Sequence, residues 1–152
     1  MKNTTLCYIE HDDCYLMLHR VKKQNDENKD KWIGIGGKLE YGESPFDCVK
    51  REILEETGLI VSKPRYRGII TFVSDEFGTE YMHLFTASDY TGSIKQKCDE
   101  GTLEWVKKTN ISNLNLWEGD KIFLNLLDTE ERFFSLKLCY SKDKLISHVL
   151  EY

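Results

Sequence analysis

Three glutamates that lie close together are the residues of this chain best suited to chemistry. Glu52, Glu55 and Glu56 fall in a helix-compatible segment that runs from Pro45 to Gly58. At about 100° per residue, such positions occupy an arc of roughly 100° on one helix face. Three like charges in one patch repel one another, so the patch must be solvated or neutralised by hard cations. Carboxylate oxygens in this number suit Mg²⁺ or Mn²⁺.

The start and the end of this helix are well marked. Ser44 fits the N-cap position, where its hydroxyl accepts from a backbone N–H, and Pro45 follows at the first helical position. Asp47 lies three residues after the cap, which gives a variant of the capping box and a favourable charge at the positive end of the dipole. Gly58 supplies a left-handed stop. The sequence therefore predicts a helix from Pro45 up to Gly58.

The buried stripe of this helix is predicted from Phe46, Val49 and Ile53, which recur at spacings of three and four. That stripe is centred about a quarter turn from the acidic patch. We therefore expect the glutamates at the rim of the core rather than far out in water. Taken alone, however, three acids on a helix are also the pattern of a plain solvated face.

A glycine-rich segment precedes the helix. Residues 32–38 read WIGIGGK and carry three glycines. Glycine lets the backbone approach a ligand closely and allows positive φ. Lys38 could hold a phosphate as a point charge. The segment is not a P-loop, because no Gly-Lys-Ser/Thr ending follows at the required spacing.

The run from Gly37 to Leu59 resembles a complete Nudix box. A glycine is followed by five residues and a glutamate, then by seven residues, Arg-Glu-Ile, one residue, Glu-Glu, one residue and Gly-Leu. So many constrained positions favour a metal site over a solvated face. The resemblance implies an α/β/α sandwich with a mixed β-sheet between helices. It also implies a divalent metal and hydrolysis of a nucleoside diphosphate linked to another group.

Site residues follow from the resemblance by position. One of the glutamates, most often Glu52, deprotonates the attacking water in this family. Arg51 resembles the arginine that orients a glutamate of the box, either Glu43 or Glu52, and a guanidinium fork suits that role. Glu100 resembles an extra ligand from a loop outside the box, with Asp99 and Glu104 as near competitors. The metal ligands implied by position are therefore the carbonyl of Gly37 and the side chains of Glu52, Glu55, Glu56 and Glu100.

Composition and length limit the class of protein. A chain of 152 residues fits one domain, 1–152, with a real core. Its net charge of −5, with 31% charged residues, argues against a general binder of nucleic-acid polymers or membranes. A small anionic substrate is still allowed, because bound metals invert the local field. The sequence does not indicate an oligomeric state.

The cysteines and the N-terminus indicate a cellular location. Five scattered cysteines without close CxxC spacing are typical of free thiols in a reducing cytosol, with zinc or disulfides as lesser alternatives. The first fifteen residues lack the apolar core of a signal peptide, and no apolar run approaches the length of a membrane span. We therefore expect a soluble cytoplasmic protein.

Strands and one further helix complete the predicted fold. Strands interleaved with two helices favour a mixed sheet with helices on both faces. Residues 22–31 are wholly polar and read as an exposed loop, although Lys22 or Lys23 could also close over phosphates. The predicted strands cover residues 4–10, 14–19, 68–73, 79–87, 103–106, 133–140 and 145–152, and the second helix covers residues 119–128.

The resemblance extends to residues 115–120 and there points to the oxidised-purine nucleoside triphosphate diphosphatases within the family. These enzymes cleave between the α and β phosphates and release a monophosphate and pyrophosphate. By position, Trp117 resembles the aromatic that stacks on the purine, Asp120 an acid that hydrogen-bonds its edge, and Phe72 a further pocket aromatic. From the residues alone, Trp117 could instead pack on the following helix, Asp120 could cap that helix, and Phe72 could be ordinary sheet core.

Two positions depart from the pattern of this branch. Ile33 stands where a base-reading asparagine is expected, and Gly119 stands where a second acid is expected beside Asp120. Lost polar readers weaken discrimination between bases. Because the rest of the resemblance points to this branch, 8-oxo-dGTP is still the substrate that we expect to be favoured. The alternatives are a broad pyrophosphohydrolase acting on other nucleoside diphosphate derivatives and a non-catalytic nucleotide-binding regulator, which would not need the intact glutamates.

Overall fold

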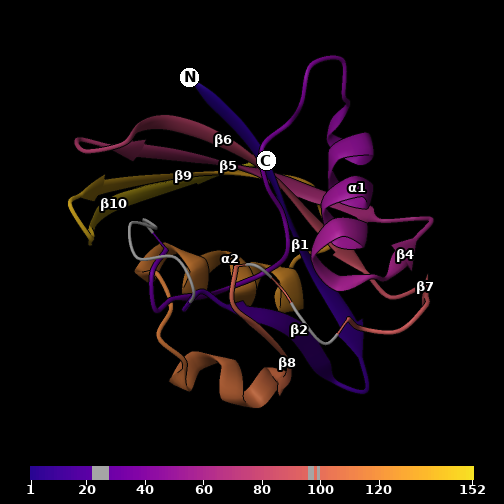
Figure 1. The fold of residues 1–152 in the computed structure, drawn as a ribbon. Coiled ribbons are helices and arrows are strands. Elements are labelled where there is room, and N and C mark those ends of the chain that lie inside the picture. The colour runs from indigo at the N-terminus through magenta and orange to yellow at the C-terminus, as the bar shows by residue number, and fades with distance from the viewer. Residues whose placement is uncertain (22–27, 96–97, 99) are drawn as a thin grey trace.

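The computed structural model describes residues 1–21, 28–95, 98 and 100–152 of the chain, and Lys23 lies outside these residues. In the described part, an eight-stranded mixed sheet is accompanied by two α-helices and a small second sheet (Figure 1). The elements are β1 (Lys2–His11), β2 (Cys14–His19), β3 (Trp32–Ile33), α1 (Pro45–Thr57), β4 (Ile60–Val61), β5 (Arg65–Ser74), β6 (Gly78–Ala87), β7 (Tyr90–Thr91), β8 (Thr102–Lys107), the 3₁₀ helix η1 (Lys108–Asn113), α2 (Glu118–Thr129), β9 (Phe134–Ser141) and β10 (Lys144–Glu151).

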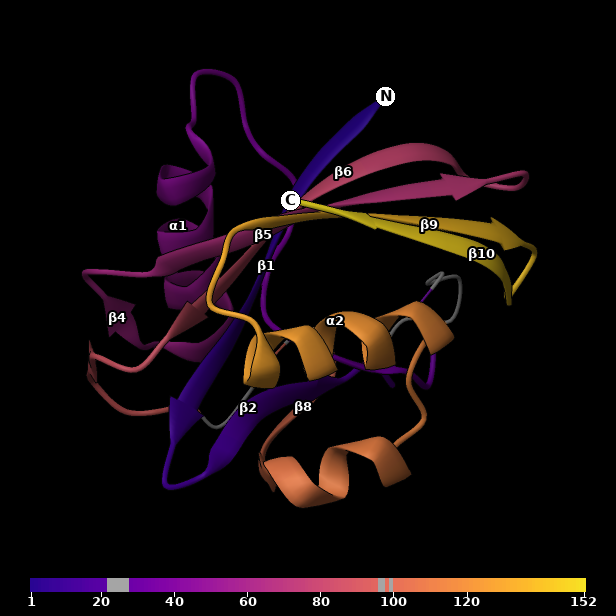
Figure 2. The ribbon, with the colours of Figure 1, turned by 180° about the vertical axis from the view of Figure 1, so that it is seen from behind.

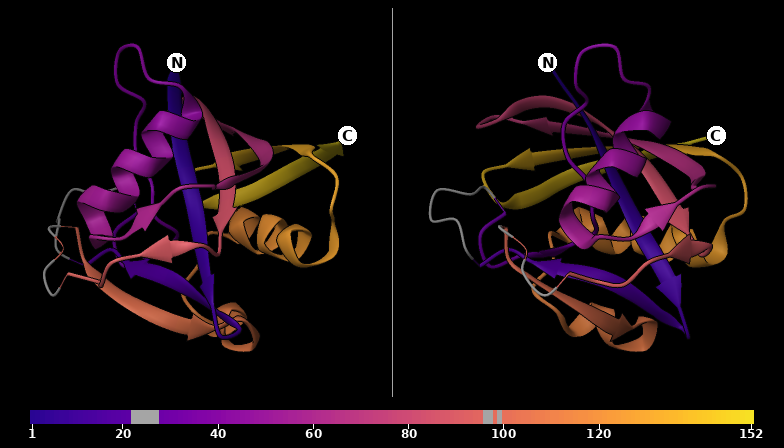
Figure 3. Two further views of the ribbon diagram at one scale, coloured as in Figure 1. Left: turned by 90° about the vertical axis from the view of Figure 1, so that its right-hand side faces the viewer. Right: turned by 45° about the vertical axis from the view of Figure 1, so that its right-hand side comes forward.

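The large sheet has the strand order β10-β9-β5-β6-β1-β2-β3, and β8 pairs with β2. The β1–β6 and β5–β9 pairs are parallel, and the other pairs of this sheet are antiparallel. α1 and α2 lie on opposite sides of β1 (Figure 3). From behind, α2 runs between β9 and β10 above and β2 and β8 below (Figure 2). This arrangement confirms the predicted mixed sheet between helices.

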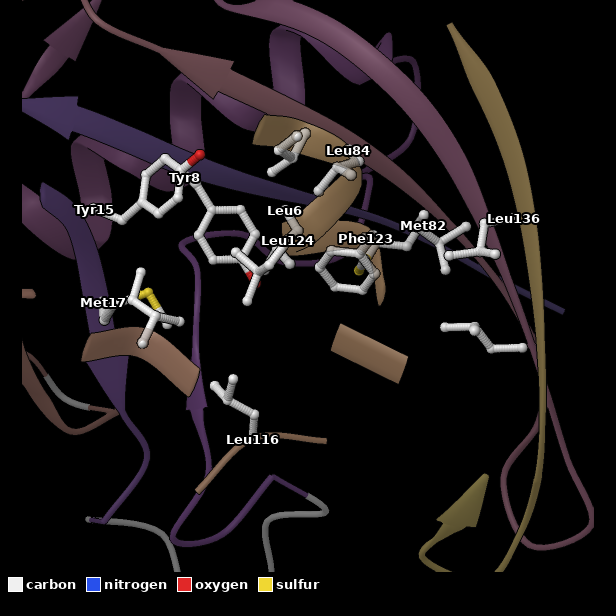
Figure 4. Close-up of a cluster of buried hydrophobic side chains, with 14 of the residues drawn as sticks. Leu6, Tyr8, Tyr15, Met17, Met82, Leu84, Leu116, Phe123, Leu124 and Leu136 are labelled. Carbon is white, nitrogen blue, oxygen red and sulfur yellow. The ribbon is translucent and has the colours of Figure 1, made fainter. Parts of the chain in front are cut away.

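The alternation of side chains along β1 shows how the core is divided between the two helices. Leu6 and Tyr8 belong to the apolar cluster on the α2 side, whereas Cys7 and Ile9 belong to the cluster on the α1 side. A strand buried on both faces produces such an unbroken apolar run. Figure 4 shows part of the α2-side cluster, in which Phe123 of α2 points toward Tyr8. The two clusters hold α1 and α2 against the same sheet.

The predicted ends of α1 are confirmed. Ser44 Oγ accepts from the backbone N–H of Asp47 at 3.0 Å, and the Asp47 carboxylate accepts from the backbone N–H of Ser44 at 3.0 Å. Gly58 closes the helix at φ 82°. The predicted stripe is wrong at Phe46, which is 41% exposed, because it lies in the first turn and makes only edge contacts with the rings of Tyr66 and Phe85.

The other predicted strands and the second helix are confirmed, and short elements were missed. The two-residue strands β3, β4 and β7 are too short to show a hydrophobic period, and η1 has a single buried side chain. The hairpin between β9 and β10 turns through Lys142 at φ 55°. Among the described residues, no helix is long and apolar enough to cross a membrane.

Candidate active site

A cavity of about 240 Å³ opens between the sheet, the glycine-rich segment and the start of α2. We call the end lined by Gly37 and Lys38, next to the glutamates of α1, the acid end. We call the end lined by Trp117 and Asp120, where a nucleobase is expected, the base end. Gly37, Lys38 and Arg20 line the cavity on the side of α1. At the opposite side, its walls include Trp117 and Asp120. A single cavity therefore joins the predicted residues Gly37 and Lys38 to the predicted residues Trp117 and Asp120, while the glutamates of α1 are not part of its lining.

The glycine at position 37 leaves room for the carboxyl group of Glu52, which lies against its backbone. A Cβ atom on Gly37 would come within 2.6 Å of the Glu52 carboxyl carbon. The carbonyl of Gly37 accepts from the backbone N–H of Thr5 in β1 at 2.9 Å, which fixes the segment to the sheet. The structure thus places a backbone carbonyl and a glutamate of α1 side by side.

Glu56 is the most deeply buried acid of the predicted cluster. Its side chain is 8% exposed, and its Oε2 has no hydrogen-bond partner within the described part of the chain. Burial, followed by the charges of Glu100 and Glu52, raises the pKa of Glu56 to about 8, against the opposing charge of Arg20. Burial also raises the pKa of Glu52, which the bonds from Arg51 partly offset. These carboxylates crowd together where positive charge would stabilise them.

Arg51 binds both of the glutamates that the sequence offered as partners. Its Nε and Nη2 donate to the two carboxylate oxygens of Glu43 at 2.7 and 2.9 Å. Its Nη1 donates to Glu52 at 2.8 Å and to Glu55 at 3.1 Å. The fork lowers the pKa of Glu43 and fixes the orientation of three acids at once. Glu55 remains the most open of the three, with 59% of its side chain exposed.

Glu100 reaches the acid end from the segment before β8. It forms an ion pair with Arg20, and its charge acts on both Glu52 and Glu56. Within the described ranges, no three His, Cys, Asp or Glu side chains already converge as a metal-binding group. The reason is that two arginines hold the acids: Arg51 binds Glu55, and Arg20 binds Glu100.

The oxygen donors at the acid end nevertheless fit a hard divalent cation. The donors available are carboxylates and a backbone carbonyl, which suit Mg²⁺ and Mn²⁺. Glu56 Oε2 is buried and unpartnered among the described residues, so it has an unused acceptor at the crowded end. A cation there would offset the repulsion among Glu52, Glu56 and Glu100.

The base end of the cavity is formed by Trp117 together with residues of several elements. Its Nε1 donates to Oδ1 of Asn28 at 2.8 Å, and its ring meets Tyr140 edge-on at 5.6 Å between centroids. Lys31 Nζ lies 4.9 Å from the centroid of the same ring. Trp117 also packs against the core cluster that includes α2, so it both lines the cavity and packs on the following helix. Phe72 likewise lines the cavity while it contacts this cluster.

Asp120 lies in the wall of the cavity and does not cap α2. The N-cap residue is Trp117, and no side chain among the described residues caps this helix end. Asp120 is 4% exposed, and burial raises its pKa to about 8, with Lys31 acting in the opposite direction. The predicted alternative of a capping role is therefore wrong. A carboxyl group in this state can donate a hydrogen bond near neutral pH.

The two departures from the expected base-reading pattern have structural explanations. A Cβ atom at Gly119 would come within 2.7 Å of the Tyr140 hydroxyl, which accepts from the Gly119 N–H at 2.8 Å. A second acid beside Asp120 does not fit against this hydroxyl. Ile33 does line the cavity, and its side chain has no group to hydrogen-bond a base.

Several lining residues were missed by the sequence reasoning. The only sequence signal for such a residue is a polar side chain on the inward face of a strand. Glu80 is an example, because it shares one face of β6 with the buried residues Met82 and Leu84. That signal needs the pairing of strands before it points to a site. The missed residues that line the cavity include Lys2, Thr4, Arg20, Asn28, Glu80 and Tyr140.

Comparisons with known proteins agree with this geometry. The NUDIX domain model matches residues 2–127. The chain is 34% identical to a Nudix hydrolase of Bacillus subtilis, YvcI, over 131 residues, which cover 84% of this chain and 79% of that protein. It is 33% identical over 125 residues to the oxidized purine nucleoside triphosphate hydrolase of Danio rerio, covering 80% of this chain and 78% of that one.

A solved structure of a relative extends the match to nearly the whole fold. The crystal structure of the mutator MutT protein from Bacillus halodurans superposes with a TM-score of 0.88 at 30% identity, covering 99% of this chain and 98% of that one. The domain match, the two relatives and the cavity with its acid end lead to one conclusion: the chain belongs to the Nudix hydrolase family.

Proposed function

We propose that this protein hydrolyses a purine nucleoside triphosphate between its α and β phosphates, with 8-oxo-dGTP as the favoured substrate. The products would be the nucleoside monophosphate and pyrophosphate. The observation that carries the proposal is a single cavity whose wall at one end includes Gly37, directly beside the crowded carboxylates of Glu52 and Glu56, and at the other end includes Trp117 and the buried acid Asp120. The similarity to the oxidized purine nucleoside triphosphate hydrolase of Danio rerio supports the same substrate class.

The triphosphate would lie at the acid end. Gly37, through its carbonyl, and Glu52, Glu55, Glu56 and Glu100 would hold Mg²⁺, with Mn²⁺ as the alternative. A bound divalent cation supplies neutralisation of phosphate charge and a lowered pKa for bound water. Arg20 and Lys38 line the same end and could hold non-bridging oxygens. A role for Lys23 stays a prediction, since that residue is outside the described ranges.

Glu52 is the proposed general base of the reaction. It is held against the backbone of Gly37 and oriented by Arg51, so its carboxylate has a fixed place at the acid end. Arg51 acts through the glutamates as a positioning group, because its donors reach Glu43, Glu52 and Glu55. Stabilising their orientation matters because proton abstraction requires the base within hydrogen-bond reach of the water.

The purine would lie at the base end. Stacking of a base on an aromatic side chain contributes about 1–3 kcal/mol, and Trp117 and Phe72 both line the cavity. Asp120, protonated near neutral pH by its burial, could donate to an acceptor on the base edge. The polar edge of the base would therefore be read by a neutral carboxyl group rather than by a charged one.

A broader pyrophosphohydrolase is the second candidate, and Ile33 favours it. This residue lines the cavity but has no side-chain hydrogen-bonding group. It therefore does not discriminate between bases that differ in the donors and acceptors along their edges. The net charge of −5 supports free nucleotides rather than nucleic-acid polymers or membranes as partners. A single domain over residues 1–152 and a cytoplasmic location stay predictions. The proposed site uses residues from Arg20 to Asp120, all within the matched domain.

Release of pyrophosphate from a panel of nucleotides, with Mg²⁺ and with chelator, tests the proposal. The panel contains 8-oxo-dGTP, dGTP, dATP, dCTP, a nucleotide sugar and ADP-ribose. We expect Mg²⁺-dependent release of pyrophosphate, fastest from 8-oxo-dGTP. Turnover of the nucleotide sugar or ADP-ribose above all triphosphates would favour the broad enzyme. Binding of nucleotides without turnover of any of them would favour the non-catalytic regulator.

A further inference from the structure

Glu80 occupies the centre of the sheet surface that forms the floor of the cavity. In the β5–β6 ladder it lies opposite Phe72, and in the β6–β1 ladder it lies opposite Lys2. All three residues line the cavity. The next inward pair, Met82 and Thr4, lies one step deeper in the same ladder. An acidic side chain therefore stands directly beside the aromatic residue that is proposed to contact the base.

Two neighbours from β1 hold the carboxylate of Glu80 in place. The hydroxyl of Thr4 donates to its Oε2 at 2.6 Å, and Lys2 Nζ lies 3.6 Å from its Oε1. The side chain of Glu80 is 24% exposed. A carboxylate has about four acceptor positions, and among the described residues Thr4 contacts one of its oxygens and Lys2 the other. Glu80 therefore keeps acceptor capacity toward the cavity.

Glu80 and Asp120 offer complementary chemistry across the cavity. The charge of Glu80 contributes to the raised pKa of Asp120, so the two groups are within electrostatic reach of each other. Asp120, from α2, is buried and can donate, whereas Glu80, paired with Lys2, can only accept. A flat base between them would meet a donor on one side and an acceptor on the other.

The charges at the two ends of the cavity also set the direction of a nucleotide. Arg20 and Lys38 line the acid end, where the phosphates are proposed to lie. A triphosphate placed at the other end would meet the carboxylate of Glu80, which repels it. The base is the part of a nucleotide that suits this end. Its recognition by an ionised acceptor requires N–H donors on its edge.

A guanine-type edge matches this requirement better than an adenine-type edge. Guanine presents two adjacent donors, N1–H and the 2-amino group, which match the two oxygens of a carboxylate. Hypoxanthine keeps N1–H and lacks the amino group. Adenine has an acceptor at N1, which a carboxylate repels. We propose that Glu80 is a specificity-determining residue that selects purines carrying N1–H and a 2-amino group, an inference that rests on and deepens the proposed function.

Binding of monophosphates to the protein without metal tests the inference. Isothermal titration calorimetry compares dGMP with dIMP, which differ only in the 2-amino group, for the wild type and for Glu80→Gln. Glutamine keeps the size of the side chain and an acceptor for Thr4 while it removes the charge. We expect the wild type to prefer dGMP by about 10- to 100-fold, in line with a good bidentate base contact. In Glu80→Gln this preference should fall to about twofold or less.

A matched variant and a wild-type measurement complete the test. Glu131→Gln alters an exposed acid paired with Arg65 at 2.8 Å, outside the residues that line the cavity, and should keep the preference. Should Glu80→Gln fail to fold, the wild-type affinities decide, and their expected order is dGMP, then dIMP, then dAMP. An unchanged preference in Glu80→Gln, or dIMP or dAMP binding as tightly as dGMP, would overturn the role of Glu80. Pyrophosphate release from triphosphates by the wild type reports separately on the proposed function.

Discussion

The acid end and the base end of the cavity are built in different ways. At the acid end, Gly37 and the glutamates of α1 lie within twenty residues of sequence, and Arg51 binds three acids from the same stretch. At the base end, Phe72, Glu80 and Trp117 come from β5, β6 and the start of α2. The proposed hydrolytic residues are therefore local in sequence, whereas the proposed base-contacting residues are brought together by the pairing of distant strands.

The buried acids at the two ends also differ in what surrounds them. Glu56 is surrounded by the charges of Glu52 and Glu100, and its raised pKa reflects repulsion as well as burial. The pKa of Asp120 is raised mainly by burial, and the positive charge of Lys31 acts to lower it. A divalent cation would therefore relieve the crowding at the acid end. The base end needs no such ion, and Asp120 can stay protonated.

The largest expected effect comes from breaking the acid end at Glu52. Glu52→Gln keeps the shape of the side chain against Gly37 but removes its charge and its basicity. We expect kcat for the preferred triphosphate to fall by at least about 100-fold, as for loss of a general base. Steady-state pyrophosphate release measures this effect. Glu40→Gln, an acid of the same region that is 66% exposed, should keep kcat within about threefold.

Loss of the arginine fork should have the next largest effect. Arg51→Lys retains the charge but cannot form the two parallel bonds to Glu43. We expect metal affinity or activity to fall by about 10- to 100-fold, as for other groups that orient ligands. Mn²⁺ titration and turnover both report it. Arg65→Lys alters an exposed pair with Glu131, and equal losses in the two variants would contradict the role of Arg51.

At the base end, Trp117→Ala should chiefly raise KM for purine nucleotides. Loss of about 1–3 kcal/mol of stacking corresponds to roughly 5- to 150-fold in KM, with kcat much less affected. Initial-rate measurements over a range of dGTP concentrations give both constants. Trp105→Ala serves as the control, because Trp105 packs against His11 and Tyr90 rather than in the cavity. An unchanged KM in Trp117→Ala would remove this residue from the base site.

A further expected effect concerns the pH dependence of folding rather than activity. Asp120 ionises near pH 4 when unfolded but has a pKa of about 8 when folded. Between these values the folded state keeps a proton that the unfolded state loses, so stability falls as pH rises, by at most about 1.4 kcal/mol per pH unit. Asp120→Asn lacks this dependence. Urea unfolding at several pH values should show the stability of Asp120→Asn relative to wild type rising from pH 5 to pH 8.

Asp128, an exposed acid of the same helix, provides the control for that experiment. Asp128→Asn alters an exposed carboxylate of α2 and should leave the slope of stability against pH close to that of the wild type. If Asp120→Asn and the wild type had the same slope, Asp120 would not be held protonated by the fold. A base bound at this end would then meet a charged carboxylate at Asp120.

The sequence predicted α1 and its ends well because their signals are short-range. The caps at Ser44 and Gly58 depend on neighbouring residues, and the spacing of the glutamates depends only on the helical repeat. Phe46 was misplaced because burial in a first turn depends on what packs there, and β5 and β6 leave that face partly open. Local patterns thus identified the element correctly and one of its buried residues wrongly.

The base end could be predicted only by family resemblance, and then incompletely. Glu80 enters the cavity because β6 pairs with β5 and with β1, a fact of tertiary structure that no spacing reveals. In the sequence, Gly119 stands where the related enzymes have a second acid. In the structure, the hydroxyl of Tyr140, twenty-one residues away, occupies the space that a side chain at this position would need. The shape of the proposed base site therefore depends on contacts between distant elements.

The most direct measurement of the central claim is the location of a divalent cation. A crystal of the wild type soaked with Mn²⁺ and a non-hydrolysable analogue of dGTP would show manganese by its anomalous scattering. We predict at least one ion bound to Glu56 and Glu52 at about 2.0–2.4 Å, between α1 and the phosphates. A bound nucleotide with no ion beside these glutamates, or with its phosphates at the Trp117 end, would contradict the account.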